Sequence, residues 1–407
     1  MAYIPPHKRH SLDKGRQSPT EESLVPLFKK KLSLSNRNRS RKIVYADHAI
    51  SRWFAVGLTD SDQFPSHIHL KPVSLESFER QSGEKPLILV NSHVNEVKCF
   101  SFVDNSELRE NCLRTPWLII AENIQQDLLS SFEILRKEMH YHGLEKVKPI
   151  LVARFGKICF HGIPLVGLER VQEKQVNETI LRQLKRSLYT NIPASYMENV
   201  IDEVILKVGV DFEEEKDIYH VKLSDNRRPD SIVSCKCCVN TDKRLQFYKM
   251  ELNQVRQMVA DISCLDKNLD LRLMLCSKRI LTAPTDDEIK SINDLVSSAV
   301  LDSDVKGGLR WPLGKTSSGN RYSVVGVWHT VARSYSSSSL RLKVRHADRC
   351  DFRSGTGEAT MEIYLKLKGI VSELQEQGAE SDSVSNMLKD NLKLIWDNFL
   401  CCEPILT

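Results

Sequence analysis

The chain has 407 residues, of which 41% are hydrophobic and 27% charged, a balance typical of a folded protein with a buried core. No apolar run approaches the roughly eighteen residues of a membrane-spanning helix, and no apolar signal segment follows Met1. The eleven cysteines lack the spacing of a disulfide framework, which predicts reduced thiols and a cytoplasmic or nuclear location.

The first segment, residues 1–42, carries eleven Lys and Arg against three Asp and Glu, although the whole chain has a net charge of only +5. Apolar residues are few in it, so we expect a disordered basic arm that meets an acidic partner or acts as a solubilising tail. Its start has a pair of prolines that favours a stiff, extended peptide suited to docking. This predicted docking motif consists of Tyr3, Ile4, Pro5, Pro6, His7, Lys8 and Arg9.

Residues 43–195 are predicted to form an N-terminal α/β subdomain. Apolar runs predict buried strands at 86–91 and 117–121, and apolar residues at three- and four-residue steps predict a helix from Ile124 to Met139. The segment 148–162 reads as two strands that fold back at Gly156. A second amphipathic helix is expected over 176–188, ending before Pro193.

Residues 196–407 are predicted to form a second subdomain, of antiparallel sheet and helices. Alternating apolar residues indicate strands at 218–223, 232–239, 245–252 and 269–281, followed by a helix whose capping box is Thr285 and Glu288. A hairpin is expected over 322–346, and two helices over 361–374 and 387–399. The predicted fold class is therefore α+β, with largely antiparallel sheet, packed helices and the basic arm in front.

A second basic region lies between Lys306 and Arg353, with ten Lys and Arg against two acids. Within it, Leu340, Leu342 and Val344 alternate with cations, so one face of that strand is predicted to be apolar and the other cationic. Aromatic residues lie close by in the sequence, which is the composition of a nucleic-acid platform. A solvated edge strand guarded by cations is the alternative. The candidate nucleic-acid contacts are Lys306, Arg310, Lys315, Arg321, Arg341, Lys343, Arg345 and Arg349.

No complete catalytic motif occurs, and we predict no metal or cofactor site. The stretch 308–316 departs from the spacing of a phosphate loop, since five residues separate Gly308 from the Gly-Lys pair. The cysteines at 235, 237 and 238 lack a second pair for zinc and are interpreted as thiols of a strand.

The segments MAYIPPHKRH, IVYADHAISRWF, EKPLILVN, RFGKICFHG and GGLRWPLGK resemble a plant family of unknown function. Relatives in that family have been labelled ribosomal RNA methyltransferases, but the glycine-rich turn that such an enzyme needs after its first strand is missing here. The peptide YIPPHKR also resembles the YIPPHxR segment near the N-terminus of DEAD-box RNA helicases, without any helicase motif after it.

The sequence therefore favours a non-enzymatic protein that binds RNA or a ribonucleoprotein partner. A protein–protein adaptor that docks through residues 3–9 is the first alternative, and an unrecognised enzyme such as an RNA methyltransferase is the second. An RNA-binding role predicts affinity that falls steeply with salt.

Overall fold

The computed structural model describes residues 49–57, 67–76, 78–79, 83–92, 115–141, 145–162, 177–319, 321–376, 381–402 and 405–406. The predicted arm 1–42 and its docking motif, Tyr3 to Arg9, lie outside the described residues.

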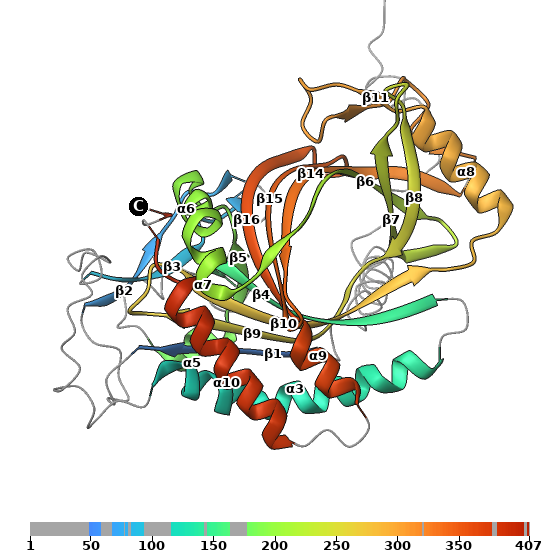
Figure 1. Ribbon diagram of the computed structural model, residues 1–407. Coiled ribbons are helices and arrows are strands. Elements are labelled where there is room, and N and C mark those ends of the chain that lie inside the picture. Colours follow the sequence, from blue (N-terminus) through green and yellow to red (C-terminus); the bar gives the residue numbers. More distant parts are fainter. Residues whose placement is uncertain are drawn as a thin grey trace, which may run out of the picture. The chain divides into compact units, whose positions relative to one another are not determined.

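The central feature of the fold is a closed β-barrel (Figure 1). Going round it, each strand pairs antiparallel with the next, and β4 pairs with β10 to close the ring. The barrel strands, in order, are β4 (Glu145–His161), β10 (Asp270–Leu281), β8 (Leu245–Leu252), β7 (Arg228–Val239), β6 (Asp211–Asp225), β14 (Tyr322–Ser336), β15 (Leu340–Asp351) and β16 (Thr356–Leu367).

The expected antiparallel sheet is confirmed. Strand β9 (Val255–Cys264) pairs antiparallel with β10 and lies outside the ring. Strand β1 (Ile50–Val56) pairs with β9, and this is the one parallel pairing among the described strands. A doubly wound parallel sheet, which the methyltransferase alternative requires, is not formed by the part of the chain described here.

Strand β4 is one continuous strand, so the prediction of two strands folding at Gly156 was wrong. Its first part pairs with β10 and β16, and its last part pairs with β3 (Leu87–Asn91) and β5 (Lys185–Tyr189), with β2 (Ile68–Pro72) beyond β3. Gly156 permits a close approach instead of a turn, because a Cβ there would lie 1.9 Å from the carbonyl oxygen of Tyr189. Strands from both expected subdomains, 43–195 and 196–407, therefore share the barrel.

Helices α3 (Pro116–Tyr141), α9 (Lys368–Gln375) and α10 (Ser381–Asn398) lie together on the outside of the barrel, on the side of β4, β9 and β10 (Figure 1). Leu128 and Phe132 of α3 are buried against Leu273 of β10 and Leu392 of α10 in the largest core cluster. Short helical turns close this core: α6 (Ala194–Asn199), the π-helical turn η2 (Val200–Val204) and α7 (Ile205–Val208). None of the described helices is long and apolar enough to cross a membrane.

Helix α8 (Asp286–Ser297) covers the other side of the barrel, over β8 and β14. Its capping box is confirmed, because Thr285 Oγ1 accepts from the Glu288 N–H and Glu288 accepts from the Thr285 N–H at 2.8 Å. Ile292 and Leu295 then belong to the same core cluster as Val221 of β6. Three short strands lie nearby: β11 (Val300–Leu301), β12 (Leu309–Arg310) and β13 (Ser317–Ser318).

Three further helix or strand predictions were wrong. The expected strand 117–121 is the first turn of α3. The expected helix 176–188 is α5 (Glu178–Gln183) followed by strand β5. The start of the expected helix 361–374 is strand β16, because the buried residues Ile363, Leu365 and Leu367 recur at steps of two.

Candidate anion-binding site inside the barrel

The barrel is apolar outside and charged inside. On β16, Ile363, Leu365 and Leu367 belong to the outer core, so Glu362, Tyr364 and Lys366 face inward by strand alternation. The same alternation operates on the other barrel strands, because their odd or even residues belong to the clusters under the helices. Among the described residues, inward cations occur on every barrel strand except β14, and they include Arg154, Lys216, Lys222, Lys236, Lys249, Lys278, Arg341, Lys343, Arg345, Arg349 and Lys366.

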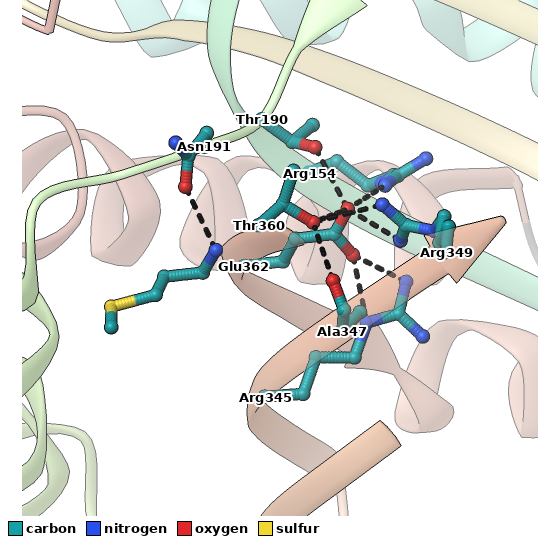
Figure 2. Close-up of polar contacts among 9 residues, drawn as sticks. Arg154, Thr190, Asn191, Arg345, Ala347, Arg349, Thr360 and Glu362 are labelled. Atoms are coloured by element: carbon teal, nitrogen blue, oxygen red, sulfur yellow. Dashed lines mark hydrogen bonds and ion pairs between the residues drawn. The ribbon is translucent and has the colours of Figure 1, made fainter. Parts of the chain in front are cut away.

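One cluster of these cations surrounds Glu362, whose side chain is 2% exposed (Figure 2). Arg345 donates to Glu362 Oε2 at 2.7 Å, and Arg349 donates to Oε1 at 2.7 Å. Arg154 lies 3.4 Å from Oε1, and the Thr190 hydroxyl donates to the same oxygen at 2.9 Å. Burial alone would raise the pKa of Glu362, but the charges of the three arginines outweigh it and hold the pKa well below its usual range.

A second cluster centres on Glu251 of β8. The ammonium groups of Lys278, Lys249 and Lys236 lie 2.8, 3.1 and 3.2 Å from its Oε1. Burial would raise the pKa of this carboxyl, but the Lys278 hydrogen bond and the lysine charges lower it to about 2. His220, on the neighbouring part of β6, stays neutral because burial and the charges of Lys236 and Lys222 lower its pKa to about 2. Each cluster thus gathers three cations around one carboxylate and keeps a net positive charge.

Three further lysines have no ion pair with a described residue. Lys222 donates to Ser234 Oγ at 2.9 Å and lies 4.0 Å from the centre of the Trp328 ring. Lys343 of β15 and Lys366 of β16 both face the interior. Lys343 is the cross-strand partner of Tyr364, and Lys366 is the partner of Arg341. Burial is the main cause that lowers the pKa of each of these lysines to about 8, with neighbouring cations adding to it. Glu214 of β6 is also inward by alternation, and it pairs with Arg341 at 2.7 Å. Among the described residues the interior therefore holds more cations than carboxylates.

Solvent reaches this interior. The side chains of Lys236 and Lys278 are each 18% exposed, Arg349 is 22% exposed and Lys249 is 34% exposed, although all of them face into the ring. A buried cation without an anion is costly, and the exposure gives a soluble anion access to the cations. The arrangement is suited to binding a multiply charged anion.

The structure divides the candidate nucleic-acid contacts into two groups. Arg341, Lys343, Arg345 and Arg349 lie on β15 and face the barrel interior. The alternation predicted for this strand is confirmed, and β15 is a central strand between β14 and β16, so the solvated-edge alternative does not describe it.

The other four candidates lie outside the barrel. Lys306 donates to the Gly357 carbonyl at 3.1 Å, and Arg310 pairs with Asp302 at 2.8 Å. Arg321 pairs with Asp225 and with Glu288 of the α8 capping box. Lys315 is exposed after β12. The structure therefore does not bring these four together with the cations of β15.

Sequence reasoning missed Arg154, Lys222, Lys236, Lys278 and the two central carboxylates. Except at Lys278, which lies between Ser277 and Arg279, the signal was the same as on β15, a charged residue between two apolar ones on a strand, but it occurs on strands far apart in the chain. The interpretation of cysteines 235, 237 and 238 as thiols of a strand agrees with the structure. Cys235 and Cys237 are fully buried beneath α8, where burial raises their pKa, and Cys238 lies on the other face of β7. Among the described residues no group of three or more His, Cys, Asp or Glu could hold a metal ion.

Residues 37–399 match the family model described as a domain of unknown function, DUF7903, so the chain belongs to that family. No curated protein matches the sequence. Solved structures match weakly. The S. pombe Pct1 RNA triphosphatase in complex with the Spt5 CTD is 11% identical, with a TM-score of 0.42 over 69% of this chain and 91% of that chain.

Two other solved structures are similar at still lower TM-scores. The Mimivirus capping enzyme triphosphatase is 8% identical, with a TM-score of 0.30 over 67% of this chain and 97% of that chain. The PH1012 protein from Pyrococcus horikoshii is 10% identical, with a TM-score of 0.24 over 54% of this chain and 91% of that chain.

Proposed function

We propose that this member of the DUF7903 family binds a chain of phosphates inside its barrel. The observation that carries the proposal is the uncompensated positive charge of the interior: Glu362 and Glu251 are each shared by three cations, and Lys222, Lys343 and Lys366 have no described carboxylate within ion-pair distance. A bound polyanion would supply the missing charge, and charge-assisted hydrogen bonds to Arg and Lys would hold it.

The distribution of the cations favours an elongated ligand over a single compact anion. On β15, the inward positions run from Arg341 to Arg349. Eight residues of strand extend over roughly 27 Å, or about 20 Å along the axis of a barrel with tilted strands. One phosphate would contact cations at only one position along this axis, whereas a linear chain of phosphates would contact cations at several positions.

The size of the barrel also limits which part of an RNA could bind inside it. The interior of an eight-stranded barrel is filled by side chains or holds one small ligand, so it has no room for a folded RNA or a duplex. An RNA would present to it a 5′ end that carries phosphates. The cations of β15, first predicted as a surface platform, would then contact this end instead of the sugar–phosphate backbone along a strand.

Calorimetric titration with inorganic tripolyphosphate tests the proposal, in the full-length protein and in Lys343→Met and Lys366→Met. We expect each variant to lose at least about tenfold in affinity, because each removes a charged donor to the ligand. Both variants should also unfold at a higher temperature than the wild type when no anion is present, because a buried, unpaired charge has been removed. This second result separates lost binding from misfolding.

Lys315→Met is the matched control, since it removes the same charge from an exposed position outside the barrel. It should leave the affinity within about twofold, because exposed charges are screened by salt. The proposal is wrong if tripolyphosphate does not bind the wild type, or if Lys315→Met weakens binding as much as Lys343→Met does.

A further inference from the structure

Trp328 is the inward aromatic residue of β14, the barrel strand that contributes no inward cation. Its neighbour Val327 is buried in the cluster under α8, so Trp328 points to the opposite face, toward Lys222 and Arg349. Trp328 is 38% exposed, while the inward residues Thr330 and Ser334 farther along the same strand are buried. A large aromatic surface is thus open to the same interior as the cations.

Three other tryptophans have structural roles that Trp328 lacks. Trp53 and Trp396 are buried in core clusters, and the Trp53 indole N–H donates to Ser263 at 3.0 Å. The indole N–H of Trp311 donates to the Leu295 carbonyl at 2.9 Å. The indole N–H of Trp328 makes no hydrogen bond to any residue that the structure describes, and the contacts of its ring are with the cations Lys222 and Arg349.

Two inward cations, Lys222 and Arg349, lie over the Trp328 ring. Lys222 Nζ lies 4.0 Å from the ring centre, and the Arg349 guanidinium carbon lies 5.4 Å from it. Arg349 in turn contacts Glu362, so the ring adjoins the arginine cluster. A phosphate held by Lys222 and Arg349 would place whatever it is attached to beside the indole, and aromatic rings stack on nucleobases regardless of base identity.

We propose that Trp328 is the stacking platform for a nucleobase, and that the phosphate chain bound in the barrel is therefore the 5′-polyphosphate of a nucleotide or of an RNA. This inference rests on the proposed function and names its ligand class. Lys222 and Arg349 hold the phosphate nearest the sugar, and the remaining phosphates extend toward the other inward cations.

The test compares inorganic tripolyphosphate with ATP by calorimetry, in the wild type and in Trp328→Ala and Trp328→Phe. The expected result for Trp328→Ala is a loss of about tenfold or more in affinity for ATP, with affinity for tripolyphosphate changed by no more than about twofold. Trp328→Phe should recover most of the ATP affinity, since it restores an aromatic face. Phe212→Ala is the control, because Phe212 is another exposed aromatic residue of a barrel strand and its ring contacts Tyr335 of the outer core, so this change should affect neither ligand.

Two results overturn the inference while leaving the proposed function intact. One is an equal loss of both ligands in Trp328→Ala, which would give the ring only the structural role of spacing Lys222 and Arg349. The other is a selective loss of ATP affinity in Phe212→Ala instead of Trp328→Ala. Failure of the wild type to bind tripolyphosphate would overturn the proposed function itself.

A third ligand separates the two sources of such a 5′-polyphosphate. A short single-stranded RNA with a 5′-triphosphate is titrated beside the same RNA with a 5′-hydroxyl. Binding of the triphosphorylated RNA more tightly than ATP supports the platform and identifies an RNA end as the ligand. Binding of ATP more tightly than either RNA supports the platform and identifies a free nucleotide. If the two RNAs bind equally and at least as tightly as ATP, the inference is overturned whatever the other affinities are, because the 5′-phosphates would then make no difference.

Discussion

Arg345 of β15 and Glu362 of β16 are direct cross-strand partners, and the guanidinium donates two hydrogen bonds to the same carboxylate oxygen. Two more arginines share this carboxylate, Arg154 from β4 and Arg349 from β15. A single buried negative charge thus holds three strands of the barrel together and allows three guanidinium groups to lie close to one another.

Replacing Glu362 with Gln should destabilise the fold by about 3 kcal/mol or more, because the three arginines then repel one another without a counter-charge. Chemical denaturation of the full-length protein measures this loss. Glu215→Gln is the matched control, since Glu215 forms a surface ion pair with Arg333 at 3.2 Å and is about half exposed. That change should cost less than about 1 kcal/mol. Equal costs for the two variants would contradict the role assigned to Glu362.

The same substitution should strengthen anion binding. Without its carboxylate, the cluster has a higher positive charge, so the affinity of Glu362→Gln for tripolyphosphate should exceed that of the wild type, by about tenfold if one charge-assisted contact is freed. Saturating tripolyphosphate should also recover part of the lost stability. Thermal unfolding with and without the anion measures the recovery. An affinity below that of the wild type would mean that Glu362 helps to hold the ligand rather than occupying its place.

Anion affinity should fall as the pH rises through about 8. Burial lowers the pKa of four inward lysines to about 8, so they are mostly charged at neutral pH and lose their protons between pH 7 and 9: Lys222, Lys236, Lys343 and Lys366. A bound anion favours the charged form, so binding near pH 8 should take up protons. Calorimetry in buffers of different ionisation enthalpy detects this uptake, and its absence would exclude these lysines from the site.

The stability of the ligand-free protein should respond to pH in the opposite sense. A lysine whose folded pKa is about 8 binds its proton less tightly than in the unfolded chain, where the pKa is about 10.4. Between these values the unfolded state binds more protons, so these lysines make the folded state more stable as the pH rises from about 8 to 10. Lys343→Met should show a weaker rise. An unchanged rise in this variant would count against the lowered pKa of Lys343.

Gly156→Ala should destabilise the protein by about 2 kcal/mol, because its Cβ would lie 1.9 Å from the Tyr189 carbonyl oxygen and the backbone of β4 or β5 must move. Gly355→Ala is the comparison. Gly355 has open space around it, and its φ of 65° should cost only about 1 kcal/mol. Denaturant titration of both variants measures the difference, and a smaller cost at Gly156 would mean that the two strands separate easily.

The sequence by itself determined those features that depend on neighbours along the chain. The capping box of Thr285 and Glu288 needs only two residues three positions apart. The apolar and cationic faces of β15 follow from strict alternation between Leu340 and Arg345. The antiparallel sheet followed from alternating strands joined by short polar turns.

The local sequence pattern gave wrong predictions where a helix period and a strand period fitted the same residues. Met361 and Leu365 are four apart, as on a helix, but they also lie on one face of a strand, and only pairing with β15 selects the strand. Gly156 looked like a turn because the contact that requires a glycine, the backbone of Tyr189, lies 33 residues farther along the chain.

Only the tertiary structure decided which side of the sheet the cations face. Alternation separates Leu342 from Lys343 but does not say whether the charged face meets solvent or the inside of a barrel. That outcome depends on β4 pairing with β10 to close the ring and on α3, α8 and α10 covering the apolar face. The cations then collect around Glu362 and Glu251 because the barrel brings together strands that are distant in sequence.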